Sequence, residues 1–332
     1  MNNPVISIYM LTYFHEKYIS QAIESVLAQK THFTYEIIIC DDCSKDGTRE
    51  IIGKYQDKYP DIIRVIYNEE NIGIPKNIYQ ARCKCRGKYI VGLSGDDYWI
   101  NDSKLEIQAT FLEQHPEYIA VFNGIELRYD DDAYAYDIVP KKNERNREFT
   151  IKDYEKGGVL RSHGFMMRNL FLNEADREYF KQAQCISDKI DDAVDVVLIM
   201  RRGRVFIIDD VTDAHRVVKV DKANGHNYNS RYSRFEKFKQ YIELINSMDN
   251  HFNMDGLQVE FENKYIGALK IAELDMLFSG KMNEYHEVFG SIPIRYRKPF
   301  FKSIYVKSIP DVIEFCINRL SDKFRTKVLG RK

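Results

Sequence analysis

The sequence lacks long apolar runs, and it lacks the many cysteines of a disulfide-stabilised protein. No run approaches the about 18 consecutive apolar residues of a membrane-spanning helix, so we expect no transmembrane segment. The first residues, Met1–Pro4, show neither the basic nor the apolar region of a secretory signal. These absences favour a cytoplasmic protein. Six cysteines are ordinary for reduced thiols, and we interpret the close pairs Cys40 with Cys43 and Cys83 with Cys85 as structural rather than zinc-binding or redox-active.

The net charge is close to zero, but basic residues gather at one end of the sequence. The formal net charge is −1, whereas residues 295–332 contain eleven Lys or Arg and only three Asp or Glu. A basic, amphipathic tail of this kind can lie on the anionic inner face of a plasma membrane. It can equally form helices that cover the core or pair two copies as a homodimer, and both interpretations stay open. We expect no nucleic acid as a partner.

The apolar pattern predicts an α/β fold, with a sheet flanked by helices. Apolar runs alternate with helical periodicity over the first two hundred residues, as in βαβ units. The predicted strands are 5–11, 36–40, 62–67, 89–93, 118–125 and 205–208, the predicted helices are 16–29, 48–59 and 75–85, and 193–200 is a helix or buried segment. Residues 126–157 are polar and weakly periodic, which indicates an irregular excursion. We expect a first domain at 1–220 and a helical region at 221–332, with its basic tail from about 295.

Polar clusters follow four of the predicted strands. In chain order they are Thr12-Tyr13, Asp41-Asp42, Asn71-Ile72-Gly73 and Asp96-Asp97. Ligands bind beyond the carboxyl ends of strands in an open parallel sheet, so these clusters predict one binding edge. Two adjacent carboxylates repel each other unless a cation or hydrogen bonds offset the charge. Asp96 and Asp97 therefore suggest Mg²⁺ or Mn²⁺ carrying a diphosphate, with a solvated Asp-Asp turn as the alternative.

A series of ordered motifs runs through the same part of the chain. The motifs are Val5–Tyr13, Tyr18–Gln29, Asp41-Asp42-x-Ser44-x-Asp46-Gly47-Thr48, Asn71-x-Gly73 and Gly95–Trp99. Together they resemble glycosyltransferase family 2, the inverting enzymes of the GT-A fold, in its bacterial cell-surface polysaccharide type. The resemblance is strong over 4–125, weak over 160–218 and absent from the helical tail. It implies a Rossmann-like, mainly parallel sheet flanked by helices, with a helical C-terminal region appended.

The resemblance also implies a reaction. A sugar would move from a nucleoside diphosphate donor, UDP-hexose by the family pattern, to a hydroxyl of a glycan or lipid-linked glycan, as in capsule or lipopolysaccharide synthesis. Mn²⁺ or Mg²⁺ would stabilise the departing diphosphate. A lipid-linked acceptor at the inner face of the plasma membrane would suit the membrane-bound interpretation of the basic tail.

Donor contacts are the largest set of residues that the resemblance implies. They are Thr12, Tyr13, Asp41, Asp42, Asn71, Lys76, Asp96 and Arg216. Tyr13 stands where the family stacks an aromatic ring on the nucleotide base, and Asp42 where a carboxylate accepts the N–H of the base. Asp41 would orient that turn. Lys76 would lie near the donor phosphates, and Asp96 near the ribose and the sugar.

The implied metal ligands are Asp97, Asp96 and His215. Two positions depart from the family pattern, because Ser94 replaces the first Asp of a DxD motif and Val218 replaces a His. We therefore expect Asp97 to be the main ligand. Either His215 or His226 could take the place of the missing His.

An inverting transfer needs a general base that takes the proton of the acceptor hydroxyl. The family places this carboxylate about a dozen residues before a Gly-Lys or Gly-Arg turn. Counting back from Gly203 reaches Asp192, with Asp191 as the less favoured choice and Asp188 as an outside candidate. The alternative is a solvated helix start, where the helix dipole favours Asp.

Trp99 and His163 are the implied acceptor contacts. The Trp99 ring could stack on the apolar face of a sugar, or it could pack in the core. His163 lies in the segment 157–168, which resembles the acceptor side of the family.

A sugar nucleotidyltransferase and an inactive scaffold are the alternative functions. The nucleotidyltransferase would need a glycine-rich loop with a basic residue after the first strand, where this chain has Thr12–Glu16. A catalytically inactive nucleotide-binding scaffold protein is conceivable because Ser94 and Val218 depart from the family pattern.

Overall fold

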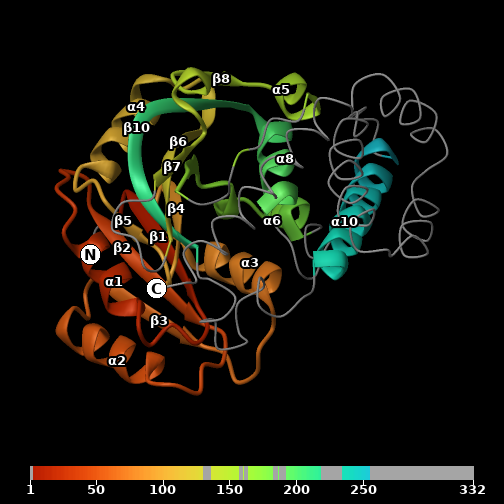
Figure 1. Cartoon of the computed structure of the whole chain (residues 1–332). Helices are drawn as coiled ribbons and strands as arrows, with labels where there is room; N and C mark the ends of the chain where they lie inside the picture. Colours follow the sequence, from red (N-terminus) through yellow and green to blue (C-terminus); the bar gives the residue numbers. More distant parts are fainter. Residues whose placement is uncertain are drawn as a thin grey trace, which may run out of the picture. The chain divides into compact units, whose positions relative to one another are not determined.

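The computed structural model describes residues 3–129, 136–156, 160, 164–181, 186, 192–217 and 234–254. The chain divides into two compact units, Met1–Tyr154 with Gly158–Arg231 and Glu155–Gly157 with Tyr232–Lys332. The first unit contains the sheet, and helix α10 is the described helix of the second (Figure 1). The domain boundary at 220 stays a prediction.

Parallel strands and the helices between them form the first half of the sheet. The strands are β1 (Ile6–Thr12), β2 (Tyr35–Asp41), β3 (Ile63–Tyr67) and β4 (Tyr89–Ser94), and the helices are α1 (Ile19–Leu27), α2 (Thr48–Lys58) and α3 (Ile74–Lys84). The strands lie in the order β3-β2-β1-β4, and every neighbouring pair is parallel (Figure 1). The α/β prediction is confirmed, and each of these elements begins and ends within three residues of its predicted bounds.

The apolar pattern explains why these residues form strands and a covering helix. Nearly all side chains of β1 and β2 are buried, including those that point to opposite faces of the sheet. In α1, Ile19, Ala22, Ile23 and Val26 recur at helical spacing and are buried in the same core. Full burial of each Ile or Val contributes roughly 1.5–3 kcal/mol. The same core therefore supports the strands whose ends carry the polar clusters.

The second half of the sheet is mixed. It continues from β4 in the order β9-β6-β10-β5, with β7 paired to β6 and β8 to β10. Among these described strands β6 and β10 are parallel, and the other pairs are antiparallel. The elements are β5 (Tyr98–Trp99), α4 (Lys104–Gln114), β6 (Tyr118–Tyr129), β7 (Tyr136–Val139), β8 (Arg147–Phe149), β9 (Met166–Arg168), α6 (Glu174–Lys181), α8 (Asp192–Arg202) and β10 (Arg204–Val217), with 3-10 turns at Lys142–Glu144 and Leu170–Leu172.

The irregular excursion predicted for 126–157 is wrong where the structure describes this segment. β6 continues to Tyr129, and β7, β8 and the short helix α5 (Ile151–Glu155) follow. β7 and β8 are exposed or half-buried along most of their length, so their side chains show no clear apolar period. The late strand predicted at 205–208 is also longer, because β10 continues to Val217 after shifts of register against β6.

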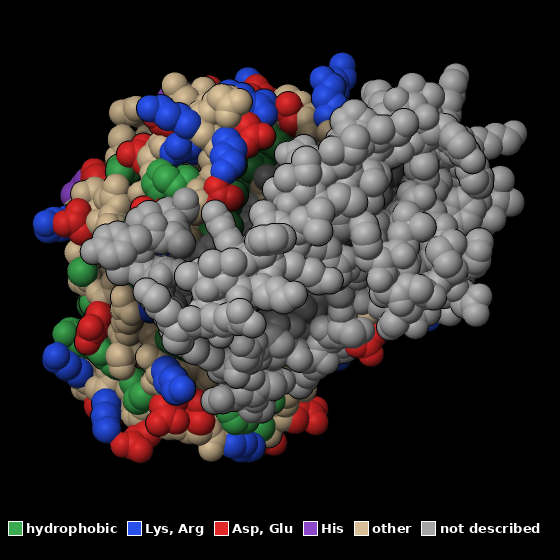
Figure 2. All heavy atoms as spheres, viewed as in Figure 1, with side chains coloured by type: hydrophobic (Ala, Val, Ile, Leu, Met, Phe, Trp, Pro, Cys, Tyr) green, Lys and Arg blue, Asp and Glu red, His purple; other side chains and the backbone are tan. Residues whose placement is uncertain are grey.

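The described part of the second unit is one helix. α10 (Arg234–Met254) buries Ile242 and Ile245, which belong to the stripe predicted from the sequence. Within the described residues, no helix is both long and apolar enough to cross a bilayer. The basic tail lies outside the described residues, so membrane contact and dimerisation stay predictions. On the face seen in Figure 2, acidic and basic side chains intermingle over the described surface.

Candidate active site

The polar clusters predicted from the sequence meet at one edge of the first unit. Thr12 pairs with Asp41 across β1 and β2, and Leu11 pairs with Ser94 across β1 and β4. The backbone N–H of Asp42 donates to the carbonyl of Thr12 at 2.9 Å. Because the strands are parallel and in register, their carboxyl ends present these residues side by side.

The carboxylate of Asp42 holds the loop that follows β3. It accepts hydrogen bonds from the backbone N–H groups of Ile72 and Gly73 at 2.9 and 3.0 Å and from the Asn68 side chain at 3.0 Å. Gly73 adopts a positive φ of 84°, which favours glycine. A carboxylate has about four acceptor positions, so the three bonds leave one for a ligand. The side chains of Asn71 and Lys76 are exposed beside this loop.

Asp41 and Thr12 carry buried oxygen atoms that no described residue satisfies. One oxygen of Asp41 accepts from the Ser44 backbone at 3.0 Å and from the Arg49 guanidinium at 2.5 Å, so Asp41 fixes the turn. Its other oxygen, Oδ1, and Oγ1 of Thr12 are buried and have no hydrogen-bond partner among the described residues. Buried polar atoms of this kind point to water or a ligand at this edge.

The loops after β1 and β2 are tied together by side chains of the Asp-Asp-x-Ser motif region. Ser44 accepts from the backbone N–H of Phe14 at 2.9 Å, and Thr48 accepts from that of His15 at 3.0 Å. In return, Glu16 accepts from the backbone N–H of Gly47 at 2.9 Å. These cross-loop bonds fix the path of the residues around Tyr13, which is half-buried and edge-on to Phe14.

The Asp96 carboxylate lies between a hydroxyl and two imidazole rings. Ser94 donates to Asp96, and His15 Nε2 is 3.7 Å from the Asp96 carboxylate. Burial alone would raise the pKa of Asp96, but His15, Ser94 and His215 together hold that pKa below its usual value. The sequence reading missed His15. Its only signal is its place three residues after the end of β1.

Asp97 is buried and joins the end of β4 to β10. Its carboxylate accepts from the backbone N–H of Arg216 at 2.8 Å, and its other oxygen is 3.0 Å from Nδ1 of His215. The Arg216 guanidinium contacts the Asp96 carbonyl and Gln21, and it stacks between the rings of Tyr18 and Tyr98 at 4.8 and 4.6 Å. The structure thus brings Asp96, Asp97, His215 and Arg216 together, although residues 96 and 216 are far apart in the sequence.

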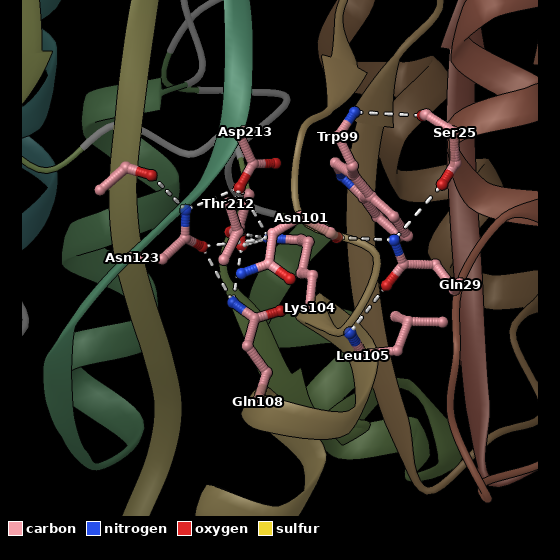
Figure 3. A network of polar contacts seen from close by, with 12 residues as sticks. Ser25, Gln29, Trp99, Asn101, Lys104, Leu105, Gln108, Asn123, Thr212 and Asp213 are labelled. Atoms are coloured by element: carbon pink, nitrogen blue, oxygen red, sulfur yellow. Dashed lines mark hydrogen bonds and ion pairs between the residues drawn. The ribbon is translucent and has the colours of Figure 1, made fainter.

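A buried lysine beneath this site fixes β10 in place (Figure 3). The Lys104 ammonium is fully buried and donates to Asp213 at 2.8 Å, Asn123 at 3.0 Å and the Gly164 carbonyl at 2.5 Å. Burial lowers the pKa of Lys104, while the charge of Asp213 opposes that shift. Asp213 lies two residues before His215 on β10, so this network sets the strand that reaches Asp97. No pattern in the sequence predicts this network, since a lysine at a helix start usually lies in solvent.

The structure favours the packing interpretation of Trp99. Only 5% of this residue is exposed, and it belongs to the core cluster that includes β1 and α1. Lys104 Nζ lies 5.3 Å from the centre of its ring system. Since protein surrounds the ring, we do not retain Trp99 as an acceptor platform.

The described cysteines are free thiols. Burial raises the pKa of Cys40 to about 12, and burial also raises the pKa of Cys85. A thiolate is the reactive and metal-binding form of cysteine, so both side chains favour the inert, structural state.

The sequence profile of one enzyme family matches more than half of the chain. The family is glycosyl transferase family 2, and the match extends over residues 7–180. The chain belongs to this family. The match begins at the second residue of β1 and includes β2 to β4 and the polar clusters that follow these strands, whereas His215 and Arg216 lie beyond it.

Proteins of several bacteria are similar to part of the chain. An uncharacterized protein of Mycobacterium tuberculosis is 38% identical over 135 residues, which are 41% of this chain and 39% of that protein. The putative teichuronic acid biosynthesis glycosyltransferase TuaG of Bacillus subtilis is 40% identical over 109 residues, or 33% of this chain and 42% of that one. This chain therefore spans less than half the length of these relatives.

Solved structures share the fold. TarS residues 1–349 of S. aureus, in complex with UDP-GlcNAc, matches with a TM-score of 0.55 at 18% identity and covers 88% of this chain and 82% of that one. The mannosyltransferase PcManGT of Pyrobaculum calidifontis, in complex with GDP-Man and Mn²⁺, matches with a TM-score of 0.54 at 14% identity, over 96% of this chain and 81% of that one. At these identities the likeness shows the fold, and the GT-A type of α/β fold is thereby confirmed.

The family's metal chemistry fits the donors that the site offers. Among the described residues, no group of three or more His, Cys, Asp or Glu side chains is arranged to hold a metal ion by itself. Mg²⁺ is usually bound by one or two carboxylates together with substrate phosphates rather than by a complete protein cage. Asp97 and Asp96, with His215 adjacent, suit a metal ion that arrives with a diphosphate.

The family positions for the base and the acceptor are described only in part. Asp192 is the first residue of α8, but its side chain lies outside the described residues. Asp191, Asp188, His163 and His226 also lie outside the described residues. Their roles stay predictions.

Proposed function

We propose that this protein transfers a hexose from a UDP-sugar to a hydroxyl of a glycan or lipid-linked glycan, with inversion and with a divalent metal ion. The observation that carries the proposal is the meeting of Asp42, Asp96 and Asp97 at one sheet edge, with His215 and Arg216 beside them. Family membership supports the reaction class.

The donor base would occupy the pocket around Asp42. The remaining acceptor position of this carboxylate can take the imide N–H of uracil, and thymine would be accommodated in the same way. Tyr13, which is half-buried at the end of β1, would stack on the base. The complex of the similar TarS structure with UDP-GlcNAc favours uridine. Lys76 and Asn71, both exposed next to this loop, would contact the donor outside the base pocket.

The leaving group would lie between Asp97 and Arg216. Asp97, Asp96 and His215 would hold Mn²⁺ or Mg²⁺, which as a Lewis acid stabilises negative charge on a departing diphosphate. The Arg216 guanidinium is held by two aromatic rings and by the Asp96 carbonyl, so it is already oriented before a donor binds. A fixed positive group of this kind lowers the barrier because it needs no rearrangement during the reaction.

The acceptor would be activated from α8. Asp192, at the first position of this helix, would remove the proton from the acceptor hydroxyl as the hydroxyl oxygen attacks the anomeric carbon opposite the diphosphate. As that bond forms, the diphosphate leaves with both electrons of the broken C–O bond. Asp191 is the alternative base.

The test begins with donor binding. UDP-GlcNAc, UDP-glucose, UDP-galactose and GDP-mannose are each added with and without Mn²⁺, and the rise in melting temperature is measured. We expect one UDP-sugar to give the largest rise. If none of them stabilises the protein under either condition, the proposal fails.

Catalysis is tested on the donor that stabilises most. Release of the nucleoside diphosphate is measured for the unchanged protein, for Asp192→Asn and for the exposed control Asp61→Asn. We expect Asp192→Asn to lower the rate by about 10²–10⁴-fold with donor stabilisation retained. The control should match the unchanged protein. Donor binding without diphosphate release in any acceptor mixture would indicate an inactive binder, and release of pyrophosphate from a nucleoside triphosphate would indicate a nucleotidyltransferase.

A further inference from the structure

A buried ion pair joins α3 to α8. The Arg82 guanidinium donates to both oxygens of Asp195, each at 2.6 Å, in a two-pronged arrangement. The same guanidinium donates to the phenolic oxygen of Tyr9, on β1, at 2.7 Å. Arg82 is 2% exposed and Asp195 is 5% exposed. The three elements are thus connected at one point inside the first unit.

Aromatic rings exclude water from the pair. The Arg82 guanidinium lies 5.0 Å from the ring centre of Tyr9, 5.9 Å from that of Phe165 and 5.8 Å from that of Phe171. Burial raises the pKa of Tyr9 to about 12, although Arg82 opposes the shift, so Tyr9 is a neutral acceptor for Arg82. The Tyr9 ring needs the space above Gly92 on β4, because a Cβ there would lie 2.6 Å from the ring.

Stability alone is a poor explanation for such a pair. Removing two charges from water is costly, and a buried ion pair can often be replaced by apolar side chains without loss of stability. The pair constrains orientation more than it contributes to stability, because a planar guanidinium and a carboxylate that share two hydrogen bonds allow one relative orientation. The pair therefore fixes the direction of α8 against α3 and β1.

Asp195 links the start of α8 to the strand that carries the donor site. Asp195 lies three residues after Asp192, the first residue of α8, which is about 4.5 Å along the helix axis. On the other side, Tyr9 belongs to β1, whose carboxyl end carries the donor site. Through Arg82, the start of α8 and the donor-binding strand become one rigid frame.

We propose that Arg82 is a positioning residue that sets Asp192 against the donor by holding Asp195. The inference rests on the proposed function, in which Asp192 is the general base. A displacement of about 1 Å in a catalytic group can lower a rate by about 100-fold, so a modest tilt of α8 would be enough.

The test removes the pair without leaving a buried charge. The double variant Arg82→Met/Asp195→Leu is made both in the unchanged protein and together with Asp192→Asn. Diphosphate release is measured on the most stabilising sugar of the panel named above, at a temperature well below every melting transition. We expect kcat to fall about 100-fold in the unchanged background, with the KM for the donor and the donor-induced rise in melting temperature unaltered.

The protein that carries Asp192→Asn distinguishes a positioning role of Arg82 from a general disturbance of the structure. If Arg82 acts through Asp192, the double variant causes no further loss once Asp192 has become Asn. An equal loss in both backgrounds, or no loss in either, would overturn the proposal. Should the double variant fail to fold, Arg82→Lys gives the same comparison, because it keeps the charge but loses the two-pronged geometry. Its expected loss is about 10-fold in the unchanged background and none beyond Asp192→Asn.

A matched control uses an arginine–carboxylate pair at the amino ends of the strands, away from the donor site. Arg86 donates to buried Glu36 near the start of β2, at 2.6 Å, and Arg86→Met should leave kcat unchanged. The proposed function and this inference fail in different ways. If Asp192→Asn keeps full activity, the assigned base is wrong. If Asp192→Asn loses activity but removal of the Arg82–Asp195 pair leaves the rate unchanged, only the role of Arg82 is refuted.

Discussion

The donor edge and the β10 side of the first unit are held together by different interactions. At the donor edge, Asp42 binds backbone N–H groups of a loop 31 residues away, at Gly73. On the β10 side, a buried ion pair connects Lys104 and Asp213, which are separated by 109 residues in the sequence. A second buried pair, Arg82 with Asp195, spans 113 residues and joins α3 to α8.

The two kinds of interaction have different roles: the hydrogen bonds at the donor edge serve ligand binding, and the buried ion pairs hold the framework. Hydrogen bonds to partly accessible backbone groups can be exchanged for water at modest cost, so the donor loop can respond to a ligand. A fully buried charge has no such exchange, because water cannot reach it when its partner is removed. We therefore expect changes on the β10 side to lower stability and changes at the donor edge to lower donor affinity.

The largest expected effect is on stability, in Lys104→Met. This change leaves the Asp213 carboxylate buried without its cation, and we expect the free energy of unfolding to fall by about 3–5 kcal/mol. Urea denaturation measures the change. The paired variant Lys104→Met/Asp213→Leu should recover most of the loss, and a single variant as stable as the unchanged protein would break the comparison.

The next effect is on the reaction, in Asp97→Asn. Loss of this carboxylate should lower the rate of diphosphate release by about 10²–10³-fold, because the metal ion that stabilises the negative charge of the leaving group would no longer be held in place. The measurement is a rate at increasing Mn²⁺, in which the variant should show little metal dependence. If the variant responds to Mn²⁺ as the unchanged protein does, the metal is held elsewhere.

A smaller effect is expected on donor affinity, in Asp42→Ala. The variant loses the acceptor for the base and releases the loop at Ile72 and Gly73, so binding should weaken by about 1.5–3 kcal/mol. Calorimetry with UDP measures this loss, and Asp57→Ala on the exposed side of α2 is the control. Equal affinity in both variants would place the base outside this pocket.

The smallest effect is on the pH dependence of stability, through Glu36 at the amino end of β2. Burial raises the pKa of Glu36, but hydrogen bonds from Arg86 and Ser7 outweigh it, so the pKa lies below its usual value of 4.5. The stabilisation by Glu36 is then complete above that usual value and is lost as pH falls through the lower, folded-state value. Denaturation from pH 7 down to about pH 3 should therefore show a weaker acid dependence in Glu36→Gln, with donor affinity at pH 7 unchanged. An identical acid dependence in both proteins would contradict the assignment.

The elements that could be read from the sequence are those with strong local signals. The strands β1 to β4 are continuous apolar runs, and each is followed by a polar cluster, so both the sheet and its binding edge were predictable. β7 and β8 were missed because partly exposed edge strands have no clear period. For Trp99 the sequence left acceptor stacking and core packing open, and its burial favours packing. His15 was overlooked because its contact with Asp96 joins two strand ends.

The sequence by itself determined the α/β fold, the family and the residues at the ends of parallel strands. These follow from apolar period and from short motifs, which act over a few residues. Only the tertiary structure decided which distant charges meet, such as Lys104 with Asp213 and Arg82 with Asp195. A lysine or arginine has the same local pattern whether its partner is water or a carboxylate a hundred residues away, and burial alone makes that choice.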